Sequence, residues 1–366
     1  MTDLAGRWAK TRAALHNAAL DGMLLTTEPS IFYLSGTVGS RPPGLIVSAD
    51  PETEPILVCR GGERDSVAAL TSLQVLGADP RNPAATLREA FGTMGLTRGT
   101  IGFEDTAITY TEAVNLKMAL PETDFRPATQ LINRLRLVKD EEEIAHMRKA
   151  GEVSDLAMMA AIEALKAGKS ETLAAAAAES TMREHGMFIA YETLIGSGFR
   201  SGLLRRYPNF TVPDPDDIIK IDLAAKLSFA SGYGYHTDQT RSITIGKPSP
   251  EKQALLEATR DVQEAIVAAL KPGKTVREVS LEGLAVVKGT SFEGLTSMSG
   301  HGLGLDIHEW PSFNTTSEVI LEPGQCYAIE PHIIVPGRHT ACLEDTLIIT
   351  ENGHERITHL PYELWG

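Results

Sequence analysis

Cysteine is scarce in this chain. Its 366 residues include only three cysteines, Cys59, Cys326 and Cys342, which lie far apart and form no C-x-x-C pair. This spacing fits neither the disulfide framework of a small secreted domain nor a zinc site built from cysteine thiolates. We therefore expect a protein of a reducing compartment, and assign it to the cytoplasm.

Long apolar runs and an excess of positive charge are also missing. No stretch approaches the roughly 18 to 20 uninterrupted apolar residues of a membrane-spanning helix, and residues 1–19 lack the compact apolar core of a secretory signal. The formal net charge is −14, whereas binding to a nucleic-acid backbone needs a clustered positive surface. The composition predicts a soluble protein with no membrane and no nucleic-acid partner.

The length predicts two domains, because a single hydrophobic core rarely grows beyond about 250–300 residues. In the first third, helical stretches alternate with short apolar runs that are typical of buried strands, at residues 22–27, 44–48 and 55–59. This alternation indicates a small α/β domain. We place the boundary near residue 133, which gives an N-terminal domain of residues 1–132 and a C-terminal domain of residues 133–366.

The second region has marked helix ends and separate runs of strands. Three helices are expected: one that begins at the acidic residues 140–143 and stops at Gly168, one from Ser170 to Gly186, and one from Ser249 and Pro250 to residues 271–273. Strand-like segments occupy residues 218–223, 242–245, 326–335 and 343–350. Because helices and strands do not alternate strictly, this domain is predicted to be α+β.

The most informative stretch is residues 300–309, with the sequence GHGLGLDIHE. It holds His301 and His308 among glycines, which let a backbone pass close to a ligand. Downstream, Glu330 and Glu344 each lie inside an apolar, strand-like segment, where an unpaired carboxylate is costly. These glutamates therefore need partners.

Two aspartates upstream complete a candidate metal site. Asp222 and Asp238 flank a segment that we expect to form a long β-hairpin, which brings them together. Taken singly, each residue has an ordinary explanation: Asp222 as a salt-bridged strand residue, Asp238 as a turn cap, His301 as a loop histidine. Taken jointly, one histidine and four carboxylates form an oxygen-rich set suited to one or two divalent ions.

The same motifs resemble those of a known family. Residues 300–309, 329–331 and 343–346, with residues 238–241 before them, closely resemble the pita-bread metallohydrolases, which include Xaa-Pro aminopeptidases, prolidases, methionine aminopeptidases and creatinases. Residues 28–36 and 135–150 are similar to the creatinase-type N-terminal domain and the interdomain segment. The resemblance covers almost the whole chain and implies an α+β fold, with a C-terminal pita-bread domain preceded by a smaller α/β domain.

The resemblance also implies roles for single residues. Carried over, the ligands of two divalent ions, of Mn, Co, Zn or Fe, are Asp222, Asp238, His301, Glu330 and Glu344. His308 is expected to face the substrate and to stabilise charge near the scissile bond. Glu330 is expected to relay a proton as well as to bind metal.

Three departures from the family pattern stand out. Asp222 and Asp238 are 238 − 222 = 16 residues apart, more than the family usually keeps, and residues 227–232 look like added hairpin. Arg205 stands where the peptidases usually carry a histidine. An arginine cannot shuttle protons, but it can bind a carboxylate of the substrate. The alternative is that Arg205 belongs to a basic loop that is solvated or paired with carboxylates of the protein. Cys342 stands where an arginine is often found.

The predicted function is metal-dependent hydrolysis of an amide-like C–N bond. A water made acidic by the ions attacks the carbonyl carbon while Glu330 relays the proton, and Arg205 and His308 anchor the substrate. That substrate is a short peptide, Xaa-Pro dipeptides first, or a small molecule, and the N-terminal domain is expected to help form a homodimer. Two alternatives stay open: a metal-independent, creatinase-like hydrolase or lyase, and a non-catalytic binding protein on the same fold.

Overall fold

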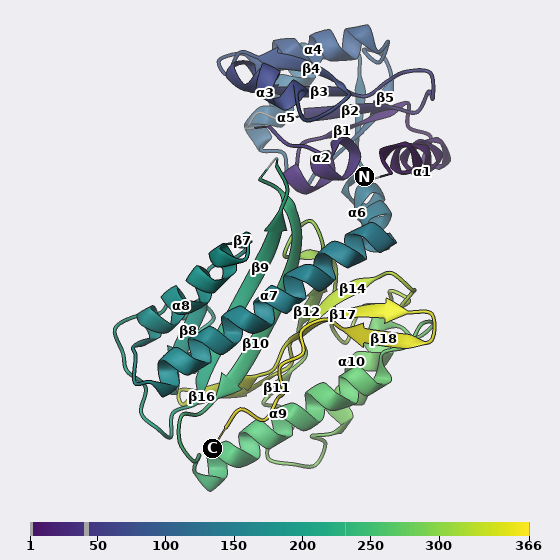
Figure 1. Cartoon of the computed structure of the whole chain (residues 1–366). Coiled ribbons are helices and arrows are strands. Elements are labelled where there is room, and N and C mark those ends of the chain that lie inside the picture. Colours follow the sequence, from purple (N-terminus) through teal and green to yellow (C-terminus); the bar gives the residue numbers. More distant parts are fainter. Residues whose placement is uncertain (1–2, 40–43, 231, 366) are drawn as a thin grey trace. The chain divides into compact units, whose positions relative to one another are not determined.

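The computed structural model describes residues 3–39, 44–230 and 232–365. Contacts between residues divide the chain into two compact units (Figure 1): unit 1 holds Met1–Arg136 with Phe229–Tyr233, and unit 2 holds Leu137–Ser228 with Gly234–Gly366. The boundary proposed from the sequence lies inside helix α6 (Thr129–Leu137). None of the helices in the described part of the chain has the combination of length and hydropathy needed to span a bilayer.

Unit 1 is built on one mixed six-stranded sheet of order β4-β3-β2-β1-β5-β6, in which β1 pairs antiparallel with β2 and parallel with β5. Its strands are β1 (Gly22–Leu25), β2 (Gly44–Ser48), β3 (Ile56–Arg60), β4 (Gln74–Ala78), β5 (Thr100–Phe103) and β6 (Asp124–Pro127). Before α6 its helices are α1 (Leu4–Asn17), α2 (Glu28–Ser35), η1 (Gly61–Glu63), α3 (Arg64–Ala68), α4 (Pro83–Thr93) and α5 (Tyr110–Ala119). The three strands expected from the sequence are confirmed as β1, β2 and β3.

Unit 2 carries most of the strands in three sheets, of order β10-β9-β7 with β8 also on β9, β11-β15-β16, and β13-β12-β14-β17-β18. The strands are β7 (Met187–Ile189), β8 (Leu194–Ser197), β9 (Ile219–Ser228), β10 (Gly234–Ile243), β11 (Thr296–Ser297), β12 (Gly300–Gly302), β13 (Glu309–Ser312), β14 (Cys326–Ile329), β15 (His332–Val335), β16 (His339–Cys342), β17 (Asp345–Thr350) and β18 (Gly353–Arg356). The helices are α7 (Glu141–Lys166), α8 (Glu171–Glu184), η2 (Gly198–Gly202), α9 (Pro250–Ala269) and α10 (Val276–Ala285).

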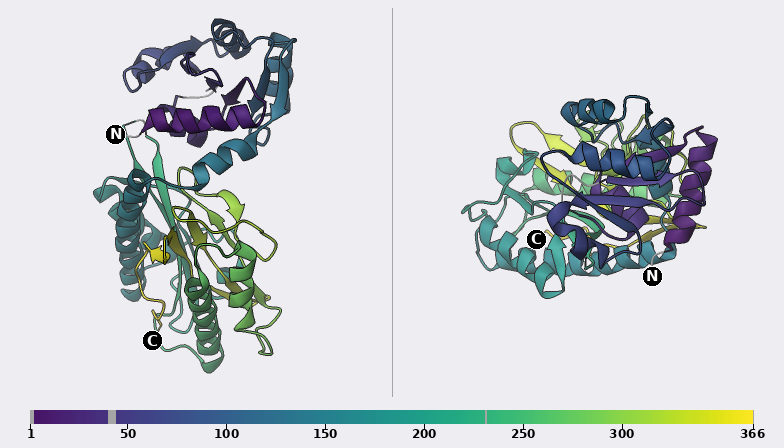
Figure 2. Two further views of the ribbon diagram at one scale, coloured as in Figure 1. Left: turned by 90° about the vertical axis from the view of Figure 1, so that its right-hand side faces the viewer. Right: turned by 90° about the horizontal axis from the view of Figure 1, so that it is seen from above.

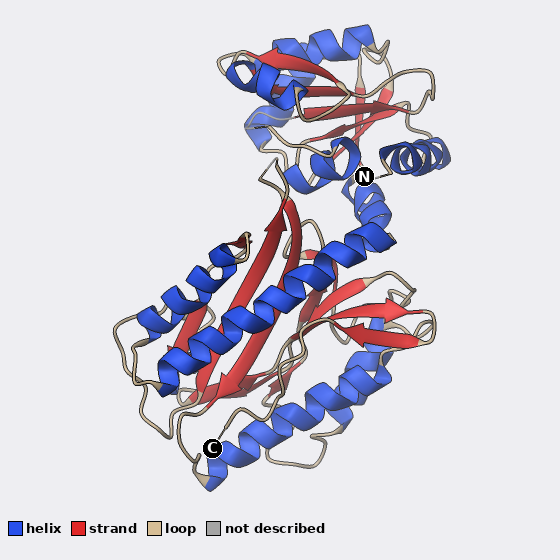
Figure 3. Ribbon diagram, viewed as in Figure 1, coloured by secondary structure: helices blue, strands red, loops and turns tan. Residues whose placement is uncertain are grey.

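Two helix pairs enclose these sheets. The views in Figures 2 and 3 show α7 and α8 on one side of the strands and α9 and α10 on the other. Each pair closes its own hydrophobic core, one with Met158, Leu165 and Ile221, the other with Val262, Tyr327 and Leu347. The helices and strands of this unit come in separate runs, so the predicted α+β class of this domain is confirmed.

The predicted helix ends also match. Asp140 caps α7: its carboxylate accepts from the backbone N–H of Glu143, and the Glu143 side chain accepts from that of Asp140. Ser170 occupies the N-cap position of α8 but makes no capping bond with its side chain. Pro250 begins α9 at a position where its missing N–H costs nothing.

Two strand predictions differ in detail from the structure. The run 326–335 is not one strand, because the chain breaks at Glu330 and Pro331 and the halves, β14 and β15, join different sheets. A proline lacks the N–H that a central strand needs, which accounts for the break. The predicted strand 242–245 is the end of the much longer β10, whose ten residues are all buried although most are polar.

Candidate metal centre

Asp238, His301 and Glu344 form a buried group of potential metal ligands. One ligand atom from each lies within 4.8 Å of the other two. Asp238 lies in β10, His301 in β12, and Glu344 just before β17, where a β-bridge to Thr240 holds it against β10. His301 Nε2 lies 3.7 Å from Asp238 Oδ2. Three segments far apart in the sequence thus place an imidazole and two carboxylates around one point.

Hydrogen bonds orient two of these side chains. His301 Nδ1 donates to the carbonyl of Gly302 over 3.0 Å, so the unprotonated nitrogen is Nε2, which faces Asp238. Such support by a backbone carbonyl is typical of metal-binding histidines. Glu344 Oε2 accepts from Thr240 Oγ1 at 2.8 Å, whereas its buried Oε1 accepts no hydrogen bond from any residue that the structure describes. A buried carboxylate oxygen without a protein donor is suited to bind a cation.

The electrostatics of the site also favour a bound cation. Burial and the charges of Asp222 and Glu330 raise the pKa of Asp238, and burial and the charge of Asp238 raise the pKa of Glu344. Burial and Asp222 raise the pKa of Glu330 to about 7, while burial and His308 lower the pKa of His301 to about 4. Four carboxylates crowded beside a neutral imidazole favour nearby positive charge, which a divalent metal can supply.

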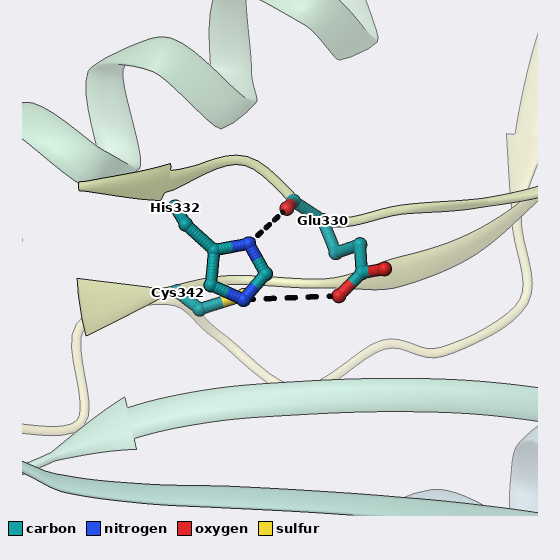
Figure 4. A group of neighbouring side chains, drawn as sticks. All are labelled: Glu330, His332 and Cys342. Atoms are coloured by element: carbon teal, nitrogen blue, oxygen red, sulfur yellow. Dashed lines mark hydrogen bonds and ion pairs between the residues drawn. The ribbon is translucent and has the colours of Figure 1, made fainter. Parts of the chain in front are cut away.

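The structure places the other two predicted ligands differently. Asp222 lies on β9 opposite Thr240, so it is a diagonal neighbour of Asp238 on the same face of the hairpin, and its Oδ2 accepts from Arg206 Nη2 at 2.6 Å. Glu330 follows β14, accepts a hydrogen bond from Ser299, and belongs to a second group of potential ligands with His332 and Cys342 (Figure 4).

The predicted substrate-binding residues His308 and Arg205 are both exposed. His308 is exposed, and its ring packs edge-on against His301 with 4.5 Å between ring centroids. Its ring also packs edge-on against Tyr191, with 6.0 Å between centroids. Tyr191 also lines an open pocket together with Arg205 and Tyr207, and Arg205 donates from Nη1 to the Tyr207 hydroxyl. A path of aromatic side chains therefore leads from the buried group to an exposed guanidinium.

The glycines around His301 serve packing. A Cβ at Gly300 would lie 2.6 Å from the carbonyl oxygen of Ala328, and one at Gly302 would lie 2.8 Å from that of Trp310. These glycines therefore let β12 fit between its neighbours β13 and β14. These glycines do permit a close approach, as the sequence indicated, but the atoms that come close belong to the protein's own backbone and not to a ligand.

Sequence reasoning missed three polar residues near the centre. Arg206 is buried directly after Arg205, Lys220 is a buried cation on the same face of β9 as Asp222, and His332 follows the Glu330-Pro331 pair. Burial and the charge of Arg206 lower the pKa of Lys220 to about 8. A lysine inside the apolar run 218–223 was the available signal, since unpaired lysines are almost never buried.

Comparisons with known protein families match nearly the whole chain. Residues 145–351 match the family described as Metallopeptidase family M24, and residues 7–138 match the Creatinase/Prolidase N-terminal domain. The chain is 30% identical over 361 residues to the uncharacterized peptidase YqhT of Bacillus subtilis, covering 97% of this chain and 98% of that protein. It is 35% identical over 267 residues to the Xaa-Pro dipeptidase of Pyrococcus furiosus, covering 72% and 75%.

Solved structures agree with the sequence relatives. The prolidase from Pyrococcus horikoshii superposes with a TM-score of 0.88 at 27% identity, covering 98% of this chain and 99% of that one. The prolidase from Pyrococcus furiosus gives a TM-score of 0.84 at 30% identity, covering 96% and 99%. The likeness includes both units, so the match is not confined to one domain.

Proposed function

The chain belongs to metallopeptidase family M24, and we propose that it is a dipeptidase that hydrolyses the amide bond of Xaa-Pro dipeptides. The observation that carries this proposal is the buried group of Asp238, His301 and Glu344, in which one buried oxygen of Glu344 accepts no hydrogen bond from the described residues. The names of its relatives, which include Xaa-Pro dipeptidases and prolidases, support the choice of substrate.

We propose that the centre holds divalent metal, drawn from Mn, Co, Zn and Fe, with two ions when it is full. Asp238, His301, Glu330 and Glu344 are the proposed ligands, and Asp222 joins them only where its bond to Arg206 is broken. Bound there, divalent ions would acidify a water molecule and polarise the scissile carbonyl. This is a donor set of oxygens and one imidazole, which several transition metals accept.

The chain's own residues have separate roles in this proposal. Glu330, whose carboxylate belongs to the proposed centre, is proposed to take up a proton from the attacking water and to pass it to the leaving amine. His308 packs beside the proposed ligand His301 and donates toward the carbonyl of the scissile bond. Arg205, exposed at the end of the Tyr191 path, binds the substrate's terminal carboxylate through its planar fork of donors.

A metal titration combined with a dipeptide assay tests the proposal. Chelator-treated protein should recover hydrolysis of Xaa-Pro dipeptides on addition of Mn²⁺, Co²⁺ or Zn²⁺. Glu344→Gln should lower metal affinity by more than about 100-fold, since even the residues that only orient ligands typically contribute 10–100-fold. Glu351→Gln, an exposed glutamate on the surface, is the matched control. Protein that binds none of these metals, yet remains active on a small amide, would favour the metal-independent alternative.

We further propose a homodimer formed with the help of unit 1. Helix α5 exposes Tyr110 (86%), Val114 (38%) and Met118 (75%). These residues are spaced four apart, so they form one apolar stripe on the helix. A second copy of the chain is the proposed occupant of that stripe.

We also retain the cytoplasm as the proposed location. Cys59, Cys326 and Cys342 are all buried, and none of them forms a disulfide with another described residue. This is the state expected of thiols in a reducing compartment.

A further inference from the structure

The carboxylate of Asp222 is already paired. Arg206 Nη2 donates to its Oδ2 over 2.6 Å, and Arg206 Nη1 donates to the carbonyl of Leu204. Arg206 is only 3% exposed. A guanidinium stays protonated at any pH a folded protein tolerates. An ion that uses Asp222 must therefore approach or displace a permanent, buried positive charge.

Two further donors lie beside Glu330. His332 and Cys342 face each other as a cross-strand pair of β15 and β16, and Figure 4 shows both next to the Glu330 side chain. One ligand atom from each of the three lies within 4.8 Å of the others. His332 Nδ1 donates to the Glu330 carbonyl at 2.7 Å, which leaves Nε2 unprotonated, 3.8 Å from Glu330 Oε2. The imidazole is thus oriented as a ligand by a backbone carbonyl, as His301 is.

The three donor atoms differ in chemical character. A carboxylate oxygen, an imidazole nitrogen and a thiolate sulfur together suit zinc or cobalt, whereas manganese prefers oxygen. Zinc bonds to such ligands are about 2.0–2.3 Å long, so ligand atoms no more than 4.8 Å apart need only small side-chain movements to reach one ion. Three protein ligands leave a fourth position open for water or substrate, as in catalytic zinc sites.

We infer that a second divalent ion binds to Glu330, His332 and Cys342 while Asp222 stays bound to Arg206. The inference builds on the proposed function in one respect, that a first ion occupies Asp238, His301 and Glu344. It gives His332 and Cys342 the role of ligands. It also predicts that the two sites prefer different metals. The first site is rich in oxygen ligands, and the second site selects zinc or cobalt over manganese.

Lys220 opposes this second ion. Lys220 is 3% exposed, and its ammonium lies close enough to Glu330 and Cys342 for their charges to interact with it. The positive charge repels a cation and at the same time favours the thiolate that the cation needs. Removing it while keeping an apolar stem, as in Lys220→Met, should tighten cobalt binding at the second site, because direct repulsion between two buried cations is the larger of the two effects at short range.

Cobalt titration of the metal-free protein tests the inference, because thiolate-to-cobalt charge transfer produces a near-ultraviolet absorption band. The wild-type chain should bind two cobalt ions and show this band. Cys342→Ser should lose the band and one ion, and His332→Gln should weaken the same ion. Cys326→Ser, which alters another fully buried cysteine outside the ligand group, should keep both ions and the band.

X-ray absorption of the zinc-loaded wild-type protein gives a readout that does not depend on any variant folding. A sulfur neighbour of zinc is expected. Its absence would overturn the inference, as would equal ion counts and equal spectra for wild type and Cys342→Ser. A sulfur ligand without dipeptide hydrolysis would keep this site and reject the proposed function. Dipeptide hydrolysis without a sulfur ligand would reject this site alone.

Discussion

Arg241 ties the last predicted ligand to the hairpin, and its removal is a direct test of how the centre is held. Its guanidinium is completely buried, as is its partner Asp345, to which Nη2 donates at 2.7 Å. Nη1 donates to the backbone carbonyl of Glu344 at 2.6 Å and to that of Thr240 at 2.9 Å, and Nη2 also donates to that of Leu360. One side chain therefore fixes β10, the Glu344 backbone and the C-terminal segment.

The expected cost of Arg241→Met follows from these contacts. Breaking a buried ion pair by removing one partner typically costs about 3–5 kcal/mol, because the other charge stays buried. Asp345 keeps hydrogen bonds from Thr358 and Tyr362 and an ion pair with Arg356 at 3.5 Å, which limits the loss. Two buried carbonyls and one partly buried carbonyl, however, lose a charged donor. We therefore expect about 3–5 kcal/mol. For a unit of this size that corresponds to a fall in Tm on the order of 6–20 °C.

Thermal unfolding in the presence of chelator measures this effect without the contribution of bound metal. Arg260→Met is the matched control, since Arg260 forms ion pairs with Asp261 and Glu363 at the surface and should contribute no more than about 1 kcal/mol. Arg241→Met should also weaken metal binding, through the displaced Glu344. A Tm within the error of wild type, or equal to that of the control, would refute the reasoning about buried pairing.

Three further outcomes are expected. Arg205→Ala should raise KM for Xaa-Pro dipeptides about tenfold, the lower end of a charged hydrogen bond, with little change in kcat; unchanged kinetics would show that Arg205 is only a surface residue. The raised pKa values of Glu330, Asp238 and Glu344 mean that these carboxyl groups bind protons in the folded, metal-free protein where they are ionised in the unfolded chain, so its stability should rise as pH falls through about 7, the pKa of Glu330. The rise should level off below the ordinary histidine range, because the lowered pKa values of buried His301 and His332 act in the opposite direction there; unfolding curves at several pH values check this, and metal should flatten the trend. Tyr110→Glu with Met118→Glu should convert a dimer to a monomer in light scattering, whereas a wild-type monomer would contradict the proposed interface.

Short-range sequence patterns predicted much of the fold. The acidic start of α7, the proline at the start of α9 and the apolar runs of β1, β2 and β3 each act within a few residues, so the sequence alone located them. Family motifs likewise identified the two-domain architecture. The long polar strand β10 shows the limit of this reading, because its buried side chains bond to partners that lie between 68 and 119 residues away in the sequence.

The centre itself depended on contacts that no local pattern contains. Sequence matching drew attention to Arg205, yet the structure turns Arg205 outward and its neighbour Arg206 inward to Asp222. Consecutive side chains in this loop point in different directions. An alignment that is off by one residue therefore selects the exposed arginine in place of the buried one.

The sequence by itself determined which residue types are available: the histidine and four carboxylates of the predicted site, and a cysteine where an arginine is common. Only the tertiary structure decided how they are grouped. His332 and Cys342 become neighbours because β15 and β16 pair in one particular register, and Glu330 joins them because Pro331 ends β14 where it does. Register and strand breaks follow from packing of the whole unit, since each ladder bond and buried side chain must be satisfied at once.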